Sequence, residues 1–149
     1  VNSGKTLTIS ASQTVDVGGT FDASGASIDM NSSSRLELAG NVSNLGTLDA
    51  AAGTVEYDGR TQNVLADNYY NLDIDQSGIK TSQGFVSVAG NLTVGSGATY
   101  NLAATSTIVS GSSDLNGSLT ASTGEYESIG DFHSSTIWFK HSNGYSICR

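Results

Sequence analysis

The chain has 149 residues, which suits one domain whose core is a narrow column rather than a ball. Charged residues make up only 13% of it, the formal net charge is −8, and it contains 18 glycines and no proline. An acidic chain with six Lys and Arg in total argues against nucleic acid or an anionic membrane as a partner, and the absence of an apolar run of membrane-spanning length argues against insertion.

The first segment, Val1 to Ile9, reads as a β-strand because Leu7 and Ile9 are separated by one polar residue. No polar capping element comes before it. Solenoids with uncapped ends expose unpaired strand edges, which invite stacking. We therefore expect this segment to belong to a coil that stacks on another coil.

An internal repeat follows. Val15 to Phe21 aligns with Leu36 to Val42 without a gap. The pattern recurs at Val86 to Leu92, and its latter part recurs at Leu115 to Leu119. The intervals between these copies correspond to one, two and one coils if each coil has roughly 20 to 27 residues in three strands and three turns. The chain would then hold about six coils.

The stretch from Gly53 to Ile74 predicts one such coil. Its apolar positions are Val55 and Tyr57, then Val64, then Leu72 and Ile74. They define three short strands, and we expect Tyr70 to be the inward-facing start of the third. Asp58-Gly59 and Ala66 to Asn68 interrupt the strands with residues that accept turn geometry.

A weaker repeat relates Gly53 to Asp58 with Ser135 to Lys140. Tyr145 to Ile147 would then be the next strand, and the chain stops at Arg149 before the counterpart of Leu72 to Ile74. We interpret residues 1–149 as a single β-solenoid domain that is a fragment of a longer array or a subunit that joins end to end.

The fold predicted from these patterns is all-β, a right-handed parallel β-helix (β-solenoid). Its core column is expected to contain the inward positions of every strand. These are Leu7, Ile9, Val15, Val17, Ile28, Leu36, Leu38, Val55, Val64, Leu72, Ile74, Val86, Val88, Leu92, Leu102, Ile108, Leu119, Ile129 and Ile137.

Three segments, 36–59, 62–74 and 86–102, resemble the β-strand repeats of very large, adhesin-like surface proteins secreted by bacteria, especially Bacteroidetes. The resemblance covers nearly the whole chain except its C-terminal end, 130–149, where Trp138, His141 and Cys148 depart from the pattern. It implies a right-handed β-helix, export to the cell surface, and a stalk, fibre or adhesive role. It implies no catalytic residues.

Carboxylates occupy the middle of many predicted strands and should point outward. They are Asp16, Asp29, Glu37, Asp49, Glu56 and Asp73, with Asp75 close behind. Asp16 and Glu37 are equivalent in successive repeats, so their side chains should lie about 5 Å apart, with a repulsion that a cation such as Ca²⁺ could relieve. The simpler interpretation, which we prefer, is a solvated face that prevents strand aggregation.

Other candidate sites are weaker. A glycosidase or lyase could be assembled from Asp58 with Arg60, or from Asp67 near Tyr69 and Tyr70, but both groups read more simply as turn and strand residues. His133, His141 and Cys148 are spaced too widely for an ordinary zinc site. We therefore predict no enzyme, no catalytic residues, no metal site and no cofactor beyond a weak case for Ca²⁺.

Thr6 and Thr8 form a Thr-x-Thr pair of the kind found on ice-binding solenoids, but Thr120 and Thr123 do not continue it at the same spacing. Asparagines adjoin several turns, where their amides could bond between coils. The turn asparagines are Asn41, Asn44 and Asn91, and Asn-x-Ser/Thr triplets begin at Asn31, Asn41, Asn91 and Asn116.

These observations predict a structural extracellular protein: a stalk, fibre or adhesin segment of a bacterial cell surface that self-assembles end to end into a filament. Its partners would be copies of itself or neighbouring repeats, with surface glycans as a further candidate. The alternative is a carbohydrate-binding or carbohydrate-degrading β-helix, and an ice-binding solenoid ranks below that.

Overall fold

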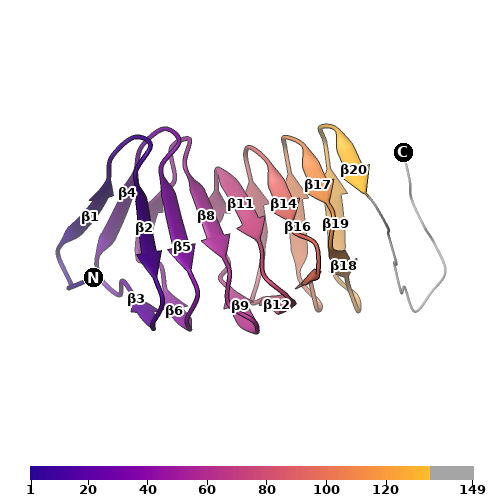
Figure 1. Cartoon of the computed structure of the whole chain (residues 1–149), viewed down its shortest axis with the longest axis horizontal. Helices are drawn as coiled ribbons and strands as arrows, with labels where there is room; N and C mark the ends of the chain where they lie inside the picture. Colours follow the sequence, from indigo (N-terminus) through magenta and orange to yellow (C-terminus); the bar gives the residue numbers. More distant parts are fainter. Residues whose placement is uncertain (135–149) are drawn as a thin grey trace.

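The computed structural model describes residues 1–134, and within this range the chain forms twenty β-strands and no helix. Each strand pairs in parallel with a strand three places along the chain, so the strands wind around one axis with three strands to a coil. The result is an elongated rod (Figure 1). The predicted all-β solenoid of about six coils is thereby confirmed.

One side of the rod is a single seven-stranded sheet, here called the long sheet. It consists of β2 (Thr14–Val17), β5 (Arg35–Leu38), β8 (Thr54–Tyr57), β11 (Asn71–Ile74), β14 (Leu92–Val94), β17 (Ser113–Leu115) and β20 (Phe132–Ser134).

The other two sides are each divided into two sheets. On the second side, β3 (Phe21–Asp22) and β6 (Val42–Asn44) form one sheet, and β9 (Gln62–Val64), β12 (Gly78–Ser82), β15 (Ala98–Asn101) and β18 (Ser118–Thr120) form another. On the third side, the first sheet is β1 (Thr6–Ile9), β4 (Ser27–Met30) and β7 (Thr47–Asp49), and the second is β10 (Asn68–Tyr69), β13 (Val86–Val88), β16 (Ser106–Val109) and β19 (Glu125–Ser128). Only the long sheet is continuous from the first coil to the last.

The coils lie at or below the lower end of the predicted range of roughly 20 to 27 residues. Paired residues lie from 17 positions apart, for Thr54 and Asn71, to 22 positions apart, for Asp22 and Asn44. The predicted coil length was too great because most strands have only two to four residues and the turns between them are tight.

The first repeat is confirmed, since Val15 pairs with Leu36 and Phe21 pairs with Val42. The alignment of Val86 to Leu92 with this repeat was wrong, because the two segments lie at different corners of the rod. Leu36 lies in β5 of the long sheet, whereas Val86 lies in β13 on the third side, and Leu92 then enters the long sheet. An Ala-Gly-Asn turn joins two short strands at both corners, so one sequence pattern builds two different corners.

The stretch from Gly53 to Ile74 contains four strands rather than three. β8, β9 and β10 make one coil, while β11 opens the next coil by stacking on β8. The strand that the prediction missed is β10, where Tyr69 is 2% exposed and points into the core. Tyr70 is 39% exposed, so its predicted inward position was wrong.

The core is a continuous column of inward side chains. The predicted members that are buried are Ile9, Ile28, Leu36, Leu38, Val55, Val64, Leu72, Ile74, Val86, Val88, Leu92, Leu102 and Leu119. Leu7, Val15 and Val17 are only half-buried, because they belong to the first coil and have a stacked strand on one side only.

Two predicted core residues face outward, and Ile137 lies outside the described residues. Ile108 is half-buried on the outer surface of β16, whose inward residues are Thr107 and Val109. Ile129 follows the end of β19 and is 66% exposed. Ile108 was misplaced because Thr107, a polar residue, takes the inward position and shifts the alternation by one.

Left-handed glycines fix one corner of the first coils. Gly4, Gly25 and Gly46 have φ values of 70°, 68° and 67°, and they lie at the same corner of successive coils. A Cβ on Gly46 would approach the carbonyl oxygens of Ala26 and Ala23 to 2.3 and 2.6 Å. Glycine at this position therefore satisfies both the backbone conformation and the close approach of the preceding coil.

Hydroxyl groups pair inside the later part of the column. The Tyr57 and Tyr69 hydroxyls are 3.0 Å apart, and the Tyr69 hydroxyl donates to the carbonyl of Leu65 at 2.8 Å. Tyr100 meets Thr107 in the same way at 3.0 Å. These tyrosines fill the column with large rings while their polar ends stay hydrogen-bonded.

We expect Ile74→Ala to destabilise the rod by about 2–5 kcal/mol, because Ile74 is fully buried and its truncation leaves a cavity between stacked coils. Ile129→Ala is the matched control, since Ile129 is 66% exposed, and it should change the free energy of unfolding by about 0.5 kcal/mol or less. Urea unfolding followed by circular dichroism measures both. Equal effects of the two substitutions would contradict the assigned core.

Burial raises the pKa of Tyr57 to about 12, from the ordinary value of 10. Because the pKa is higher in the folded chain, the associated stability is complete below about pH 10 and declines as the pH rises through about 12. Tyr57→Phe should therefore reduce the loss of stability at alkaline pH. Part of the loss should remain in this variant, because burial also raises the pKa of Tyr69. Unfolding free energies measured from pH 8 upward test this, and identical pH profiles for both proteins would refute it.

Candidate functional site

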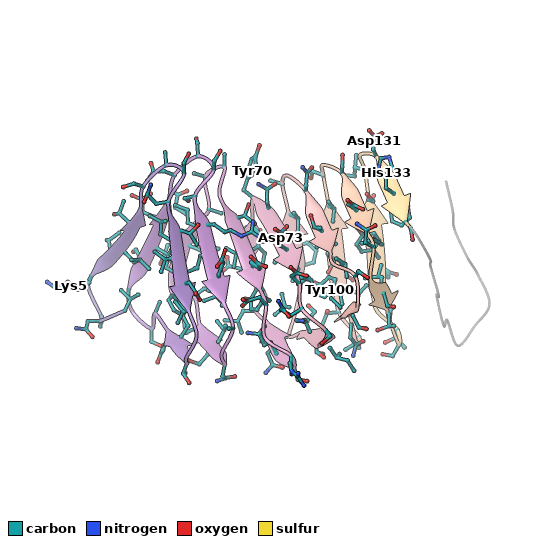
Figure 2. The ribbon with its side chains drawn as sticks, in the orientation of Figure 1. Lys5, Tyr70, Asp73, Tyr100, Asp131 and His133 are labelled. Carbon is teal, nitrogen blue, oxygen red and sulfur yellow. The ribbon has the colours of Figure 1, made fainter. Side chains whose placement is uncertain are left out.

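A column of polar side chains runs along the outer surface of the long sheet. Strand pairing places one outward residue of each strand beside the corresponding residue of the next: Asp16, Glu37, Glu56, Asp73, Thr93, Asp114 and His133. Neighbouring strands lie about 4.8 Å apart. The predicted adjacency of Asp16 and Glu37 is confirmed, and we call the stretch from Asp16 to Asp73 the carboxylate column. Figure 2 shows Asp73 near the middle of the rod and His133 at its end.

Arg35 connects three of the four carboxylates. It lies in β5 two residues before Glu37, so both side chains point outward from the same strand. Its Nε atom is 3.2 Å from Glu37 Oε1 and donates to Glu56 Oε2 at 2.7 Å. Its Nη2 atom donates to Asp73 Oδ2 at 2.7 Å. One guanidinium therefore spans β5, β8 and β11 and places a cation beside three of the stacked carboxylates.

Glu56 is the most deeply placed member of this group, with its side chain 9% exposed. Burial raises the pKa of Glu56, and its hydrogen bond and attraction to Arg35 offset this only in part. Burial opposes the charge on Arg35, but the bonds and charges of Glu56 and Asp73 outweigh it and raise the pKa of Arg35. These ion pairs cross-link the strands β5, β8 and β11 on the outer surface of the long sheet.

A second pair of stacked carboxylates lies on the third side, where Asp29 of β4 is paired with Asp49 of β7. Thr8 of β1 heads the same column, so the predicted Thr-x-Thr pair is followed by acidic residues rather than by more threonines. Within residues 1–134, no group of three or more His, Cys, Asp or Glu side chains is placed so that it could hold a metal ion.

Two buried polar side chains that sequence reasoning missed bond backbone groups at corners of the rod: Gln62 of β9 at the corner after β8, and Lys80 of β12 at the corner after β11. The Gln62 amide accepts from the Gly59 N–H and donates to the carbonyls of Leu38 and Gly40, each at 2.6 Å. Lys80 Nζ donates to the carbonyls of Asp75 and Gln76. Lys80 is fully buried, and burial lowers its pKa. The sequence around Lys80 is ambiguous: Ile79 and Thr81 flank it, so the alternation alone does not decide whether Lys80 or its two neighbours point inward.

The described residues of the weaker candidate sites lie in the turns and strands of the rod. The Asp67 carboxylate accepts from the Asn68 N–H at 2.8 Å, while Tyr69 points into the core and Tyr70 points out. Arg60 is exposed in the turn after Asp58. His133 is paired with Asp114 in the polar column, whereas His141 and Cys148 lie outside the described residues.

The predicted bonding of asparagine amides between coils holds at two corners. At one, Asn31 Nδ2 donates to the carbonyl of Ile9 at 3.0 Å. Asn71 Oδ1 accepts from the Asn91 N–H at 2.9 Å, and Asn91 Oδ1 accepts from the Ser112 N–H at 3.0 Å. Asn44 instead accepts from Gly46 within its own turn. The Asn71–Asn91 amides thus link three successive coils at the entry to the long sheet.

Comparisons of the chain with protein-family models, with curated proteins and with solved structures find no match. In the described part of the chain, no helix has the length and apolar character needed to cross a membrane.

We expect Arg35→Gln to lower the free energy of unfolding by about 1.5–3 kcal/mol at low ionic strength, because Glu37, Glu56 and Asp73 would then repel one another without a cation. Added salt should restore part of this loss by screening. Lys5→Gln is the matched control: it removes the same charge from an exposed residue in the turn before β1. Thermal unfolding at several salt concentrations measures both, and an Arg35→Gln variant as stable as the control would show that the network does not hold the coils together.

Proposed function

We propose that the chain is a structural segment of an extracellular rod, a stalk, fibre or adhesin of a bacterial cell surface, which is extended by stacking coils on coils. The observation that carries this proposal is the long sheet, which continues without interruption through seven strands. The surface location rests on the resemblance of segments 36–59, 62–74 and 86–102 to bacterial surface repeats.

The first coil is suited to stacking. β1, β2 and β3 are edge strands of their sheets, and the outer side of β1 and β2 pairs with no strand of the described residues. The Asp22 carbonyl of β3 accepts a hydrogen bond from the Val1 amino group. Val15 and Val17 are half-buried there, whereas their partners Leu36 and Leu38 in the next coil are 0% exposed. A further coil, from a longer chain or from another copy, would bury these side chains and pair these strands.

The second candidate, a carbohydrate-binding or carbohydrate-degrading β-helix, would be favoured by aromatic residues gathered in one groove. Among residues 1–134, the exposed aromatic residues are separated instead. Tyr70 lies between β10 and β11, and Phe85 lies between β12 and β13, which is a different corner of the rod. This distribution favours the structural role.

Electron microscopy of the purified chain at rising concentration tests the stacking. We expect filaments one solenoid wide, with an axial rise of about 30 Å per subunit if six coils repeat at about 4.8 Å. Val15→Lys should prevent filament formation because it places a charge on the open edge. Ser87→Lys is the control, since Ser87 is an outward residue of β13, far along the rod. Single particles at every concentration, or filaments unaffected by Val15→Lys, would contradict end-to-end assembly.

A further inference from the structure

The outer surface of the four-stranded sheet β9-β12-β15-β18 differs chemically from the rest of the rod, and we call it the neutral face. Strand pairing arranges its outward side chains in two columns. One column is Asn63, Thr81, Asn101 and Thr120, and the other is Ile79, Thr99 and Ser118.

No charged side chain points outward from these four strands, since Lys80, the one charged residue in them, is fully buried. This is notable in a chain of net charge −8 whose long sheet carries five carboxylates in one outward column. Charged side chains hold their own hydration shells, and their absence suits contact with an uncharged surface.

The neutral face is regular. Its three strand pairings keep one register without a shift, whereas the β3–β6 pair on the same side of the rod has an irregularity at Phe21 and Asp22. Groups in one column repeat about every 4.8 Å, and the two columns are about 6.7 Å apart along the strands. The face is therefore a regular two-dimensional array of side chains.

Its hydroxyl groups are positioned and available. Thr81 lies between Asn63 and Asn101, and Thr99 lies between Ile79 and Ser118. β-Branched side chains have few χ1 rotamers in a strand, so their methyl and hydroxyl groups stay in fixed directions. Within the described residues, the hydroxyls of Thr81 and Thr99 form no hydrogen bond with another protein group.

We propose that the neutral face binds ice, that is, the ordered water at the surface of an ice crystal. A regular, uncharged array of fixed hydroxyl, amide and methyl groups can hold water molecules at regular intervals, and ice presents water in regular layers. A sugar ring would favour an exposed aromatic surface, but Tyr100, the one aromatic residue of this sheet, is fully buried.

This assignment differs from the ice-binding pair considered from the sequence. Thr6 and Thr8 lie on the third side, where Asp29 and Asp49 continue the column of Thr8. Thr120 belongs to the neutral face, and Thr123 lies in the turn after β18. The array was not visible in the sequence because its members come from four strands with different sequences.

Inhibition of ice recrystallisation by the purified chain tests the proposal. The wild type should inhibit crystal growth and shape single ice crystals. Thr81→Lys and Thr99→Lys should each raise the concentration required by about tenfold or more, because each places a hydrated charge in the centre of the array. Ser87→Lys is the matched control on β13, and it should retain the wild-type activity.

Melting temperatures of the three variants are compared first, so that a loss of activity at unchanged stability reports on the surface alone. The absence of ice shaping by the wild type up to its solubility limit would overturn the proposal. Equal loss in Ser87→Lys would also overturn it. Wild-type chain that sediments with cellulose or chitin, without any effect on ice, would assign the neutral face to a neutral polysaccharide instead.

Discussion

The structure depends on parallel stacking in register, in which each coil places its residues directly beside their equivalents in the next coil. Backbone hydrogen bonds between strands impose this register. As a result, side chains at equivalent positions of successive coils form columns along the rod. An apolar column inside the rod is favourable at every step. The same rule brings like charges together outside, where Glu37 is paired with Glu56 and Glu56 with Asp73.

The cost of such a carboxylate column explains the position of Arg35. Two like charges about 5 Å apart repel by about 3 kcal/mol at an effective dielectric constant of 20, and by less than about 1 kcal/mol in water. Glu56, whose side chain is 9% exposed, lies nearer the first condition. Arg35 reaches Glu37, Glu56 and Asp73 together, and the column then continues as Thr93, which carries no charge. The repulsion among Glu37, Glu56 and Asp73 is thus offset by one guanidinium that reaches all three.

The alternation of apolar and polar residues was sufficient to predict the fold class, the number of coils and most of the core. It failed where polar side chains point inward, as Lys80 and Thr107 do, because their partners are carbonyl and hydroxyl groups outside their own strands. It also placed one repeat at the wrong corner, since different corners accept similar Gly- and Asn-containing turns. The carboxylate column could be predicted from equivalent positions, but the reach of Arg35 across two coils requires the actual coil lengths.

The Arg35 network also lies where the rod needs reinforcement. On the second side the β3-β6 sheet ends and a new sheet begins at β9, and on the third side the β1-β4-β7 sheet ends and a new one begins at β10. The coil at this junction is the shortest, with Asn71 only 17 positions after Thr54. Across the junction only the long sheet is continuous, and Arg35 binds carboxylates on its strands β5, β8 and β11. Gln62 bonds the carbonyls of Leu38 and Gly40 at the adjoining corner, where sheet pairing is interrupted. The rod is therefore two stacks of coils joined through the long sheet, and the polar groups on and beside that sheet replace the strand pairing that the other two sides lack.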